Sequence, residues 1–176
     1  MNILVLNGSP RPNGNTKRMV ESFRSGALSV GHQVDVIDVC KLHIGGCLAC
    51  EYCHTKGKGK CVQKDDMEQV YTLLKDADML VIASPIYYHG ISGQLKCVID
   101  RFYSAAYPSK PPKLKKAAMI LSSGDAAMYD GALFSFKGDF LDYLGLENMG
   151  VFTAHGAQNG SGAKLEELRA FGATLK

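Results

Sequence analysis

The sequence has no strong excess of one charge and no long apolar segment. Its formal net charge is only +3 over 176 residues. This balance argues against a dedicated nucleic-acid surface, which usually shows a strong basic excess. No apolar stretch approaches the roughly 18 residues of a membrane span. The start MNILVLNGSP lacks the basic region and cleavage site of a signal peptide. We therefore expect a cytoplasmic protein that binds neither nucleic acid nor membrane.

Several familiar nucleotide and phosphate motifs are also missing. The chain has neither the G-x-x-x-x-G-K-[ST] of a P-loop nor the G-x-G-x-x-G of a dinucleotide fold. Asn7 stands where a receiver domain carries acidic residues, and no nearby cysteine can act as a phosphatase nucleophile. Disulfides are not expected in a reducing compartment, so the six cysteines are interpreted as ligands, redox groups or core residues.

What the sequence does contain is a regular alternation of strands and helices. Apolar runs without polar alternation are typical of parallel strands that are buried on both faces. The expected strands are Ile3–Leu6, Val34–Val39, Met79–Ala83, Ala117–Leu121 and Val151–Thr153. The expected helices are Asn15–Leu28, Asp66–Leu74, Ser92–Ala105, Ala132–Leu146 and Ala163–Leu175. The alternation predicts one α/β domain over residues 1–176, with a doubly wound sheet whose ligands bind beyond the carboxyl ends of the strands.

The loop after the first strand, N-G-S-P-R-P-N-G-N-T, has the composition of a phosphate site. Its glycines allow tight turns, and its polar side chains lie beside the free N–H groups of a helix start. The candidate phosphate ligands are Ser9, Arg11, Asn13, Asn15 and Thr16. The alternative is an ordinary loop that is rich in turn-forming residues.

Two further loops at the same edge suit a planar ring. After the third strand, Pro85 stiffens a turn whose two tyrosines can flank such a ring, although they can equally just cap the sheet. Histidine titrates near neutrality, so His89 is a candidate catalytic proton donor, with a solvated loop residue as the alternative. The candidate ring contacts are Pro85, Ile86, Tyr87, Tyr88, His89, Gly90, Ser122, Ser123 and Gly124.

Together these motifs resemble a known family. G-S-P-R-x-x-G-N-T after the first strand and S-P-I-Y-Y-H-G-x-S-G-Q-L-K-x-x-x-D-R after the third are similar to the flavodoxin-like NAD(P)H-dependent FMN reductases. The resemblance covers nearly the whole chain and implies a three-layer sandwich with strand order 2-1-3-4-5. It also implies FMN in the three loops, NAD(P)H as electron donor, and a quinone, nitro or azo compound, free flavin or protein as acceptor. A homodimer or homotetramer is expected, since flavin sites of this family lie near subunit contacts.

The long connection from Lys41 to Gln63 contains four closely spaced cysteines, Cys47, Cys50, Cys53 and Cys61. Four such thiols can surround one metal centre, either zinc or an iron–sulfur cluster. Their spacing resembles that of the iron–sulfur flavoprotein branch of the family, which implies a [4Fe–4S] cluster near FMN. A metal-free thiol set and zinc remain alternatives. The alternative function is an electron carrier that has no small-molecule substrate.

The remaining cysteines and several charged residues are expected to be structural. Cys40 and Cys97 are predicted to lie in the core, and Asp100 and Arg101 to form a surface or subunit-contact feature. Two groups of lysines are interpreted mainly as solvated loop residues. They are Lys110, Lys113, Lys115 and Lys116, and then Lys56, Lys58 and Lys60, which can also offset the charge of a thiolate cluster.

Overall fold

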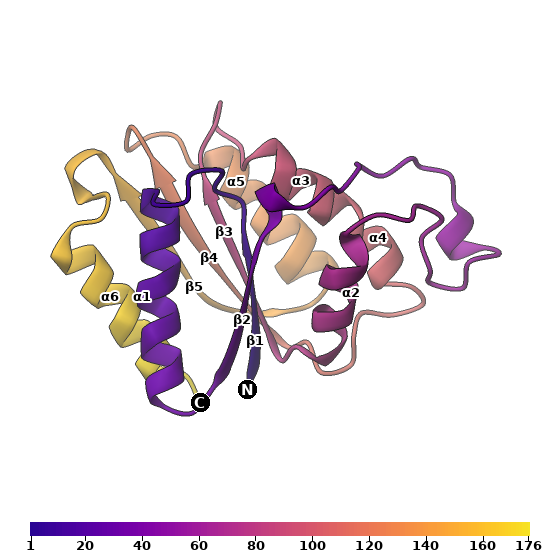
Figure 1. The fold of residues 1–176 in the computed structure, drawn as a ribbon, viewed down its shortest axis with the longest axis horizontal. Helices are drawn as coiled ribbons and strands as arrows, with labels where there is room; N and C mark the ends of the chain where they lie inside the picture. Colours follow the sequence, from indigo (N-terminus) through magenta and orange to yellow (C-terminus); the bar gives the residue numbers. More distant parts are fainter.

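The computed structural model describes all residues 1–176 and contains one parallel five-stranded sheet. Its strands are β1 (Asn2–Asn7), β2 (Gln33–Asp38), β3 (Met79–Pro85), β4 (Lys116–Ser123) and β5 (Glu147–His155). They lie in the order β2-β1-β3-β4-β5, which confirms the expected flavodoxin-like topology. Since the strands are parallel, their carboxyl ends share one edge, at the top of Figure 1.

Helices cover both faces of the sheet, as Figure 1 shows. One face carries α1 (Asn15–Ser29) and α6 (Gly162–Thr174). The other carries α2 (Met67–Asp76), α3 (Gly93–Asp100), α4 (Phe102–Ala105) and α5 (Asp130–Ser135), which continues into the π-helix η3 (Phe136–Tyr143). Short 3₁₀ turns complete the chain: η1 (Val39–Lys41), η2 (Tyr52–His54) and η4 (Gly156–Gln158). No helix combines the length and apolar character that crossing a bilayer requires.

The apolar strands alternate between two separate cores. In β1, Ile3 and Val5 pack toward α1 and α6, whereas Leu4 and Leu6 pack toward α2 and α3. Successive side chains of a strand point to opposite faces, so a strand covered on both sides needs a continuous apolar run. This requirement explains why the runs were recognisable in the sequence.

The expected helix Ser92–Ala105 is interrupted at Arg101. The Arg101 amide donates to the Val98 carbonyl and the Ser104 amide donates to the Arg101 carbonyl, a tighter spacing than in an α-helix. The interruption accompanies a side chain that turns inward, since Arg101 is only 1% exposed. The surface role predicted for Arg101 is therefore wrong, whereas Asp100 does lie at the surface and pairs with Lys96.

The last strand and the helix before it also differ from their predicted bounds. β5 extends over Glu147–His155 because sheet hydrogen bonding continues through a polar stretch that has no apolar run. Gly150, at φ +135°, lies beside an irregularity in this pairing. The helical segment ends at Tyr143, earlier than the expected Leu146, because β5 already begins at Glu147.

Candidate functional site

The loop after β1 passes close against the start of α3. The Gly8 amide donates to the Ala83 carbonyl at 2.8 Å, which fastens the loop to the end of β3. A Cβ at Gly8 would lie 2.6 Å from Ser92 Oγ, so only glycine fits there. Asn7 Oδ1 accepts from the Ser9 amide at 3.2 Å, and Ser9 Oγ accepts from the Arg11 amide at 3.3 Å. These bonds hold the loop in a tight turn.

The start of α1 has the properties of an anion site. Gly14 is the N-cap, no side chain caps the helix, and its first turn contains no acidic residue. The first helical bond runs from the Arg18 amide to the Gly14 carbonyl, which leaves the amides of Asn15, Thr16 and Lys17 available to a ligand. A Cβ at Gly14 would lie 3.1 Å from Ser9 Oγ, so the glycine keeps the turn open. Free amides and the positive end of the helix dipole favour a phosphate here.

Hydrogen bonds join the loops at this edge of the sheet. Thr16 Oγ1 lies 2.7 Å from Ser122 Oγ, and both residues are buried. The Ile86 amide donates to the Ser122 carbonyl at 2.8 Å, which ties the loop after β3 to the end of β4. The predicted residues Ser9, Thr16, Ile86 and Ser122 therefore come together. Since their hydroxyls bond each other, Thr16 and Ser122 hold the loops in place.

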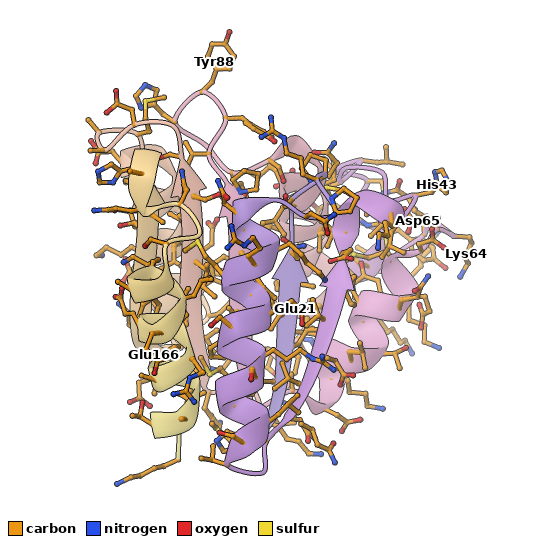
Figure 2. The ribbon with its side chains drawn as sticks, turned by 60° about the vertical axis from the view of Figure 1, so that its left-hand side comes forward. Glu21, His43, Lys64, Asp65, Tyr88 and Glu166 are labelled. Carbon is orange, nitrogen blue, oxygen red and sulfur yellow. The ribbon has the colours of Figure 1, made fainter.

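The predicted aromatic residues form a strained two-residue turn. Tyr87 and Gly90 exchange backbone bonds of 2.9 and 3.0 Å. Between them, Tyr88 and His89 adopt φ values of +47° and +64°, a conformation usually taken by glycine or asparagine. The Tyr88 side chain is 97% exposed and points away from the molecule (Figure 2). The His89 ring is exposed and makes no hydrogen bond within the chain, so its catalytic role stays a prediction.

The remaining predicted contacts lie in or beside the same three loops. Pro85 ends β3, and Ser123 ends β4 with Gly124 directly after it. Arg11 is exposed and makes no salt bridge, and its backbone faces Gly14. Asn13 and Asn15 flank the N-cap of α1. Cys40 and Cys97, which were expected in the core, are only partly buried, and Cys40 Sγ donates to the Gly8 carbonyl at 3.2 Å.

A fourth segment at this edge, the turn after β5, was not predicted from the sequence. Asn159 Nδ2 donates to the Ser123 carbonyl at 2.7 Å, while Asn159 Oδ1 is buried without a partner. A buried polar atom that is left unpaired is costly. The only sequence signal was an asparagine beside a glycine after the last strand, which is common in loops. Asn159 therefore supports the third loop, and its Oδ1 is an unused acceptor.

Asp38, at the end of β2, was also missed. It accepts hydrogen bonds from Asn7 Nδ2 at 2.9 Å and from Lys17 Nζ at 3.0 Å. Partial burial on its own raises the pKa of Asp38, but the bonds from Asn7, Lys41 and Lys17 outweigh it and lower this pKa to about 2. Asp38 therefore stays ionised beside the phosphate loop, where it orients Lys17. Both residues line a hollow of about 120 Å³ together with Ser9 and Arg11.

The four cysteines of the long loop line one small hollow of about 20 Å³, together with Arg101 and Tyr103. Cys53 is buried, Cys61 is partly buried, and Cys47 and Cys50 are exposed. Burial raises the pKa of the Cys53 thiol, and the neighbouring Cys61 and Cys47 raise it further. No three His, Cys, Asp or Glu side chains are spaced to hold a single metal ion.

The backbone between these cysteines is strained. Ala49 and Glu51, on either side of Cys50, have φ values of +50° and +56°. Such values are costly for residues other than glycine and cluster at functional sites. The Ala49 amide donates to Cys47 Sγ at 3.4 Å. Hydrogen bonds of this kind tune iron–sulfur centres.

Arg101 joins the two ends of the cysteine loop. Its Nη1 donates to the Gly45 carbonyl at 2.9 Å, and Nη1 and Nη2 bind the two Asp65 oxygens at 2.7 and 3.1 Å. Asp65 in turn accepts from the Gly45 amide at 3.1 Å. Arg101 Nε is buried and has no partner. A buried cation with one unused donor therefore lies in the wall of the hollow that the cysteines share.

Comparison with known proteins places the chain in a family. Residues 1–155 match the family NADPH-dependent FMN reductase, and the chain belongs to it. An iron–sulfur flavoprotein of Methanocaldococcus jannaschii is 34% identical over 101 residues, which is 57% of this chain and 51% of that protein. The chain thus spans about half the length of the curated relatives it matches.

Solved structures share the same fold. The NAD(P)H:quinone oxidoreductase from Methanothermobacter marburgensis has a TM-score of 0.79 and 20% identity, and the match covers 100% of this chain and 96% of that one. An FMN-dependent NADH-azoreductase from Bacillus anthracis in complex with FMN has a TM-score of 0.74 and 14% identity, with coverage of 98% and 97%. These likenesses establish the flavodoxin-like fold.

Proposed function

We propose that the chain binds FMN at the carboxyl edge of the sheet and acts as an NAD(P)H-dependent flavin oxidoreductase. One observation carries the proposal: the uncapped start of α1, with three free amides, lies beside loops that hydrogen bonds hold together. Membership of the FMN reductase family and the FMN-complexed structural neighbour support it. The proposed acceptors are a quinone, a nitro or azo compound, free flavin or a protein.

Each part of the site has a proposed role. The amides of Asn15, Thr16 and Lys17 bind the phosphate, and Arg11 adds a free positive charge. The loops after β3 and β4 hold the ring, with the Tyr87–Gly90 turn at its edge. His89 is the proposed proton donor on that turn. When bound, FMN supplies the conversion of two-electron hydride transfer into single-electron steps.

We further propose that Cys47, Cys50, Cys53 and Cys61 hold a [4Fe–4S] cluster. Two observations support this: the four cysteines line one hollow, and Arg101, whose Nε–H is unused, lines the same hollow. The hollow must open to admit the cluster, and Cys47 and Cys50 are exposed. The match to iron–sulfur flavoproteins adds support.

The flavin proposal is tested by removing hydroxyls from the phosphate loop. The double variant Ser9→Ala/Thr16→Val should lose bound FMN, because both hydroxyls hold the loop that presents the three free amides. It should keep its fold, as measured by flavin absorbance and circular dichroism. Thr72→Val is the control, because this hydroxyl bonds only within α2, to the Glu68 carbonyl. Full flavin content in the double variant would refute the phosphate site.

The cluster proposal is tested by iron and acid-labile sulfide on protein purified without oxygen. We expect about four irons per chain. Cys50→Ser should lose them, and Cys97→Ser should keep them, because Cys97 does not line the shared hollow. A wild-type protein with no iron and no sulfide would end this proposal and leave the flavin proposal standing.

One kinetic measurement distinguishes the proposed enzyme from the alternative function, an electron carrier between proteins. An enzyme of the proposed class oxidises NAD(P)H steadily when a quinone is the only acceptor, whereas a carrier is inert without its protein partners. The proposed homo-oligomer is tested separately by sedimentation. A monomer at all concentrations would contradict it.

A further inference from the structure

Lysines from three separate segments line one large cleft. Its volume is about 810 Å³, and its walls come from the residues after Cys53, from α2 and from the loop between α4 and β4. The cleft lysines are Lys58, Lys60, Lys64, Lys75 and Lys110. In the sequence, Lys58, Lys60 and Lys110 resemble solvated loop residues, whereas Lys64 and Lys75 belong to neither lysine group. Their shared position exists only in the folded chain.

None of the cleft lysines forms a salt bridge. Lys110 Nζ instead donates to the Leu144 and Gly145 carbonyls at 2.5 and 3.0 Å, which leaves its charge uncompensated. Six lysines elsewhere contact carboxylates: Lys17, Lys41, Lys96, Lys113, Lys137 and Lys164. Five lysines without a carboxylate partner therefore share one concave site.

The acidic residues of the cleft do not balance this charge. The cleft contains only Asp65 and Glu68 as acids, and Asp65 is already committed to the buried Arg101. Figure 2 shows Lys64 and Asp65 together at one edge of the molecule. A concave surface lined by one sign of charge focuses its field and attracts the opposite charge.

The cleft also offers ring surfaces and a suitable size. Tyr71 and Tyr107 line it, and Tyr107 is 36% exposed. Tyr71 donates its hydroxyl to the Arg101 carbonyl at 3.2 Å, while the exposed ring of Tyr107 can pack against a planar group. Sites for small ligands usually enclose about 300–1,000 Å³. Several phosphates and one aromatic ring would match these features.

We propose that this cleft binds a nucleotide that carries two or more phosphates, at a site separate from the flavin loops. The lysines bind the phosphates and the tyrosines contact the base. Cys61, Gln63 and Ser104 line both this cleft and the hollow of the four cysteines. A ligand in the cleft therefore contacts the wall of the cysteine loop directly. The proposal stands on the cleft alone and does not depend on a bound cluster.

The test is titration calorimetry of the FMN-loaded protein with ADP, NADP⁺ and pyrophosphate as separate probes. FMN loading keeps the probes out of the flavin phosphate site. ADP and NADP⁺ should bind more tightly than pyrophosphate, because only they carry a ring, and binding should weaken as salt screens the lysines. If pyrophosphate bound saturably and as tightly as ADP, the base would contribute nothing to the affinity. That result would overturn the nucleotide assignment.

Two double variants are compared. Each removes two positive charges, one variant inside the cleft and the other outside it. Lys60→Gln/Lys64→Gln should weaken ADP binding by about three- to tenfold, the sum expected for two exposed charge contacts. Lys56→Gln/Lys115→Gln is the control, since neither residue lines the cleft or forms a salt bridge. Hydrogen exchange of residues 58–75 should slow when ADP is added.

Two further outcomes would overturn the proposal. One is the absence of binding by any probe at millimolar concentration, which would leave the lysines as a solvated or protein-binding surface. The other is an equal loss of affinity in both double variants, which would show a general charge effect. If the protein does not retain FMN, the proposed flavin function fails first, and the comparison between the two lysine variants still tests the cleft.

Discussion

The flavin loops and the cysteine loop lie in the same molecule but are held in different ways. The loops after β1, β3 and β4 are anchored by strand ends and joined by short bonds, such as that between Thr16 and Ser122. The cysteine loop leaves the sheet entirely and is joined at its base by the buried pair of Arg101 and Asp65. The first site is therefore a product of the topology, whereas the second depends strongly on one side chain.

The strain in the two regions also differs. In the flavin loops it is confined to Tyr88 and His89 at the tip of one tight turn. In the cysteine loop it falls at Ala49, Glu51 and Lys58, between the metal-ligand candidates. Strained backbone persists only where the surroundings hold it. The comparison predicts that the cysteine loop opens more readily than the flavin loops.

The largest expected effect follows from removing the buried cation. Arg101→Met should lower the free energy of unfolding by about 3 kcal/mol, because it leaves Asp65 without its partner. Arg169→Met is the control, since Arg169 also contacts Glu166 through two bonds but at the exposed surface. That variant should cost at most about 0.5 kcal/mol. Urea denaturation of cluster-free protein measures both, and equal losses would contradict the anchoring role.

A smaller effect is expected at the bond between the first and third flavin loops. Thr16→Val should destabilise the fold by about 1–2 kcal/mol, because it leaves the buried Ser122 hydroxyl unpaired. Thr72→Val removes a hydroxyl at an exposed position and should change little. Thermal denaturation compares the two. If Thr16→Val changes hydrogen exchange in the cysteine loop as much as in the flavin loops, the two regions are not independent.

The third prediction concerns the stability of the protein at acid pH. The pKa of Asp38 is lowered from 3.8 to about 2, so its contribution is complete above about pH 4 and is lost as the pH falls through about 2. After allowance for its partial exposure, this contribution is about 1 kcal/mol. Asp38→Asn should lack this loss between about pH 4 and pH 2. Asp142→Asn, at an exposed pair with Lys137, is the control. Identical acid profiles for Asp38→Asn and wild type would contradict the assignment.

The smallest effects are expected at the strained positions. Tyr88→Gly and Ala49→Gly should each stabilise the chain by at most about 1 kcal/mol, since glycine adopts a positive φ freely. Tyr88→Gly should also weaken FMN binding, whereas Ala49→Gly should leave it unchanged. Calorimetric melting and flavin titration measure these effects. Loss of flavin in Ala49→Gly but not in Tyr88→Gly would contradict the proposed place of Tyr88 in the flavin loops.

The sequence determined the sheet and predicted the outline of the proposed flavin site. The apolar runs of β1 and β3 were visible because strands covered on both faces need apolar residues at every position. The phosphate loop was visible because glycines and short polar residues stand between a strand and a helix. Both patterns are local, so they can be read from neighbouring residues. The match to the FMN reductase family confirmed the resemblance that these motifs carried.

Only the tertiary structure decided which distant residues meet. Arg101 looked like a surface residue because its partners, Gly45 and Asp65, lie far from it in the chain. The same reason hid the contact of Asn159 with Ser123 and the cleft that gathers Lys60, Lys75 and Lys110. Whether two charges pair depends on the distance between them in the folded chain. The periodicity of side chains along the sequence does not encode this distance. The strands and the phosphate loop were therefore fixed locally, while the fold determined how the charges are paired.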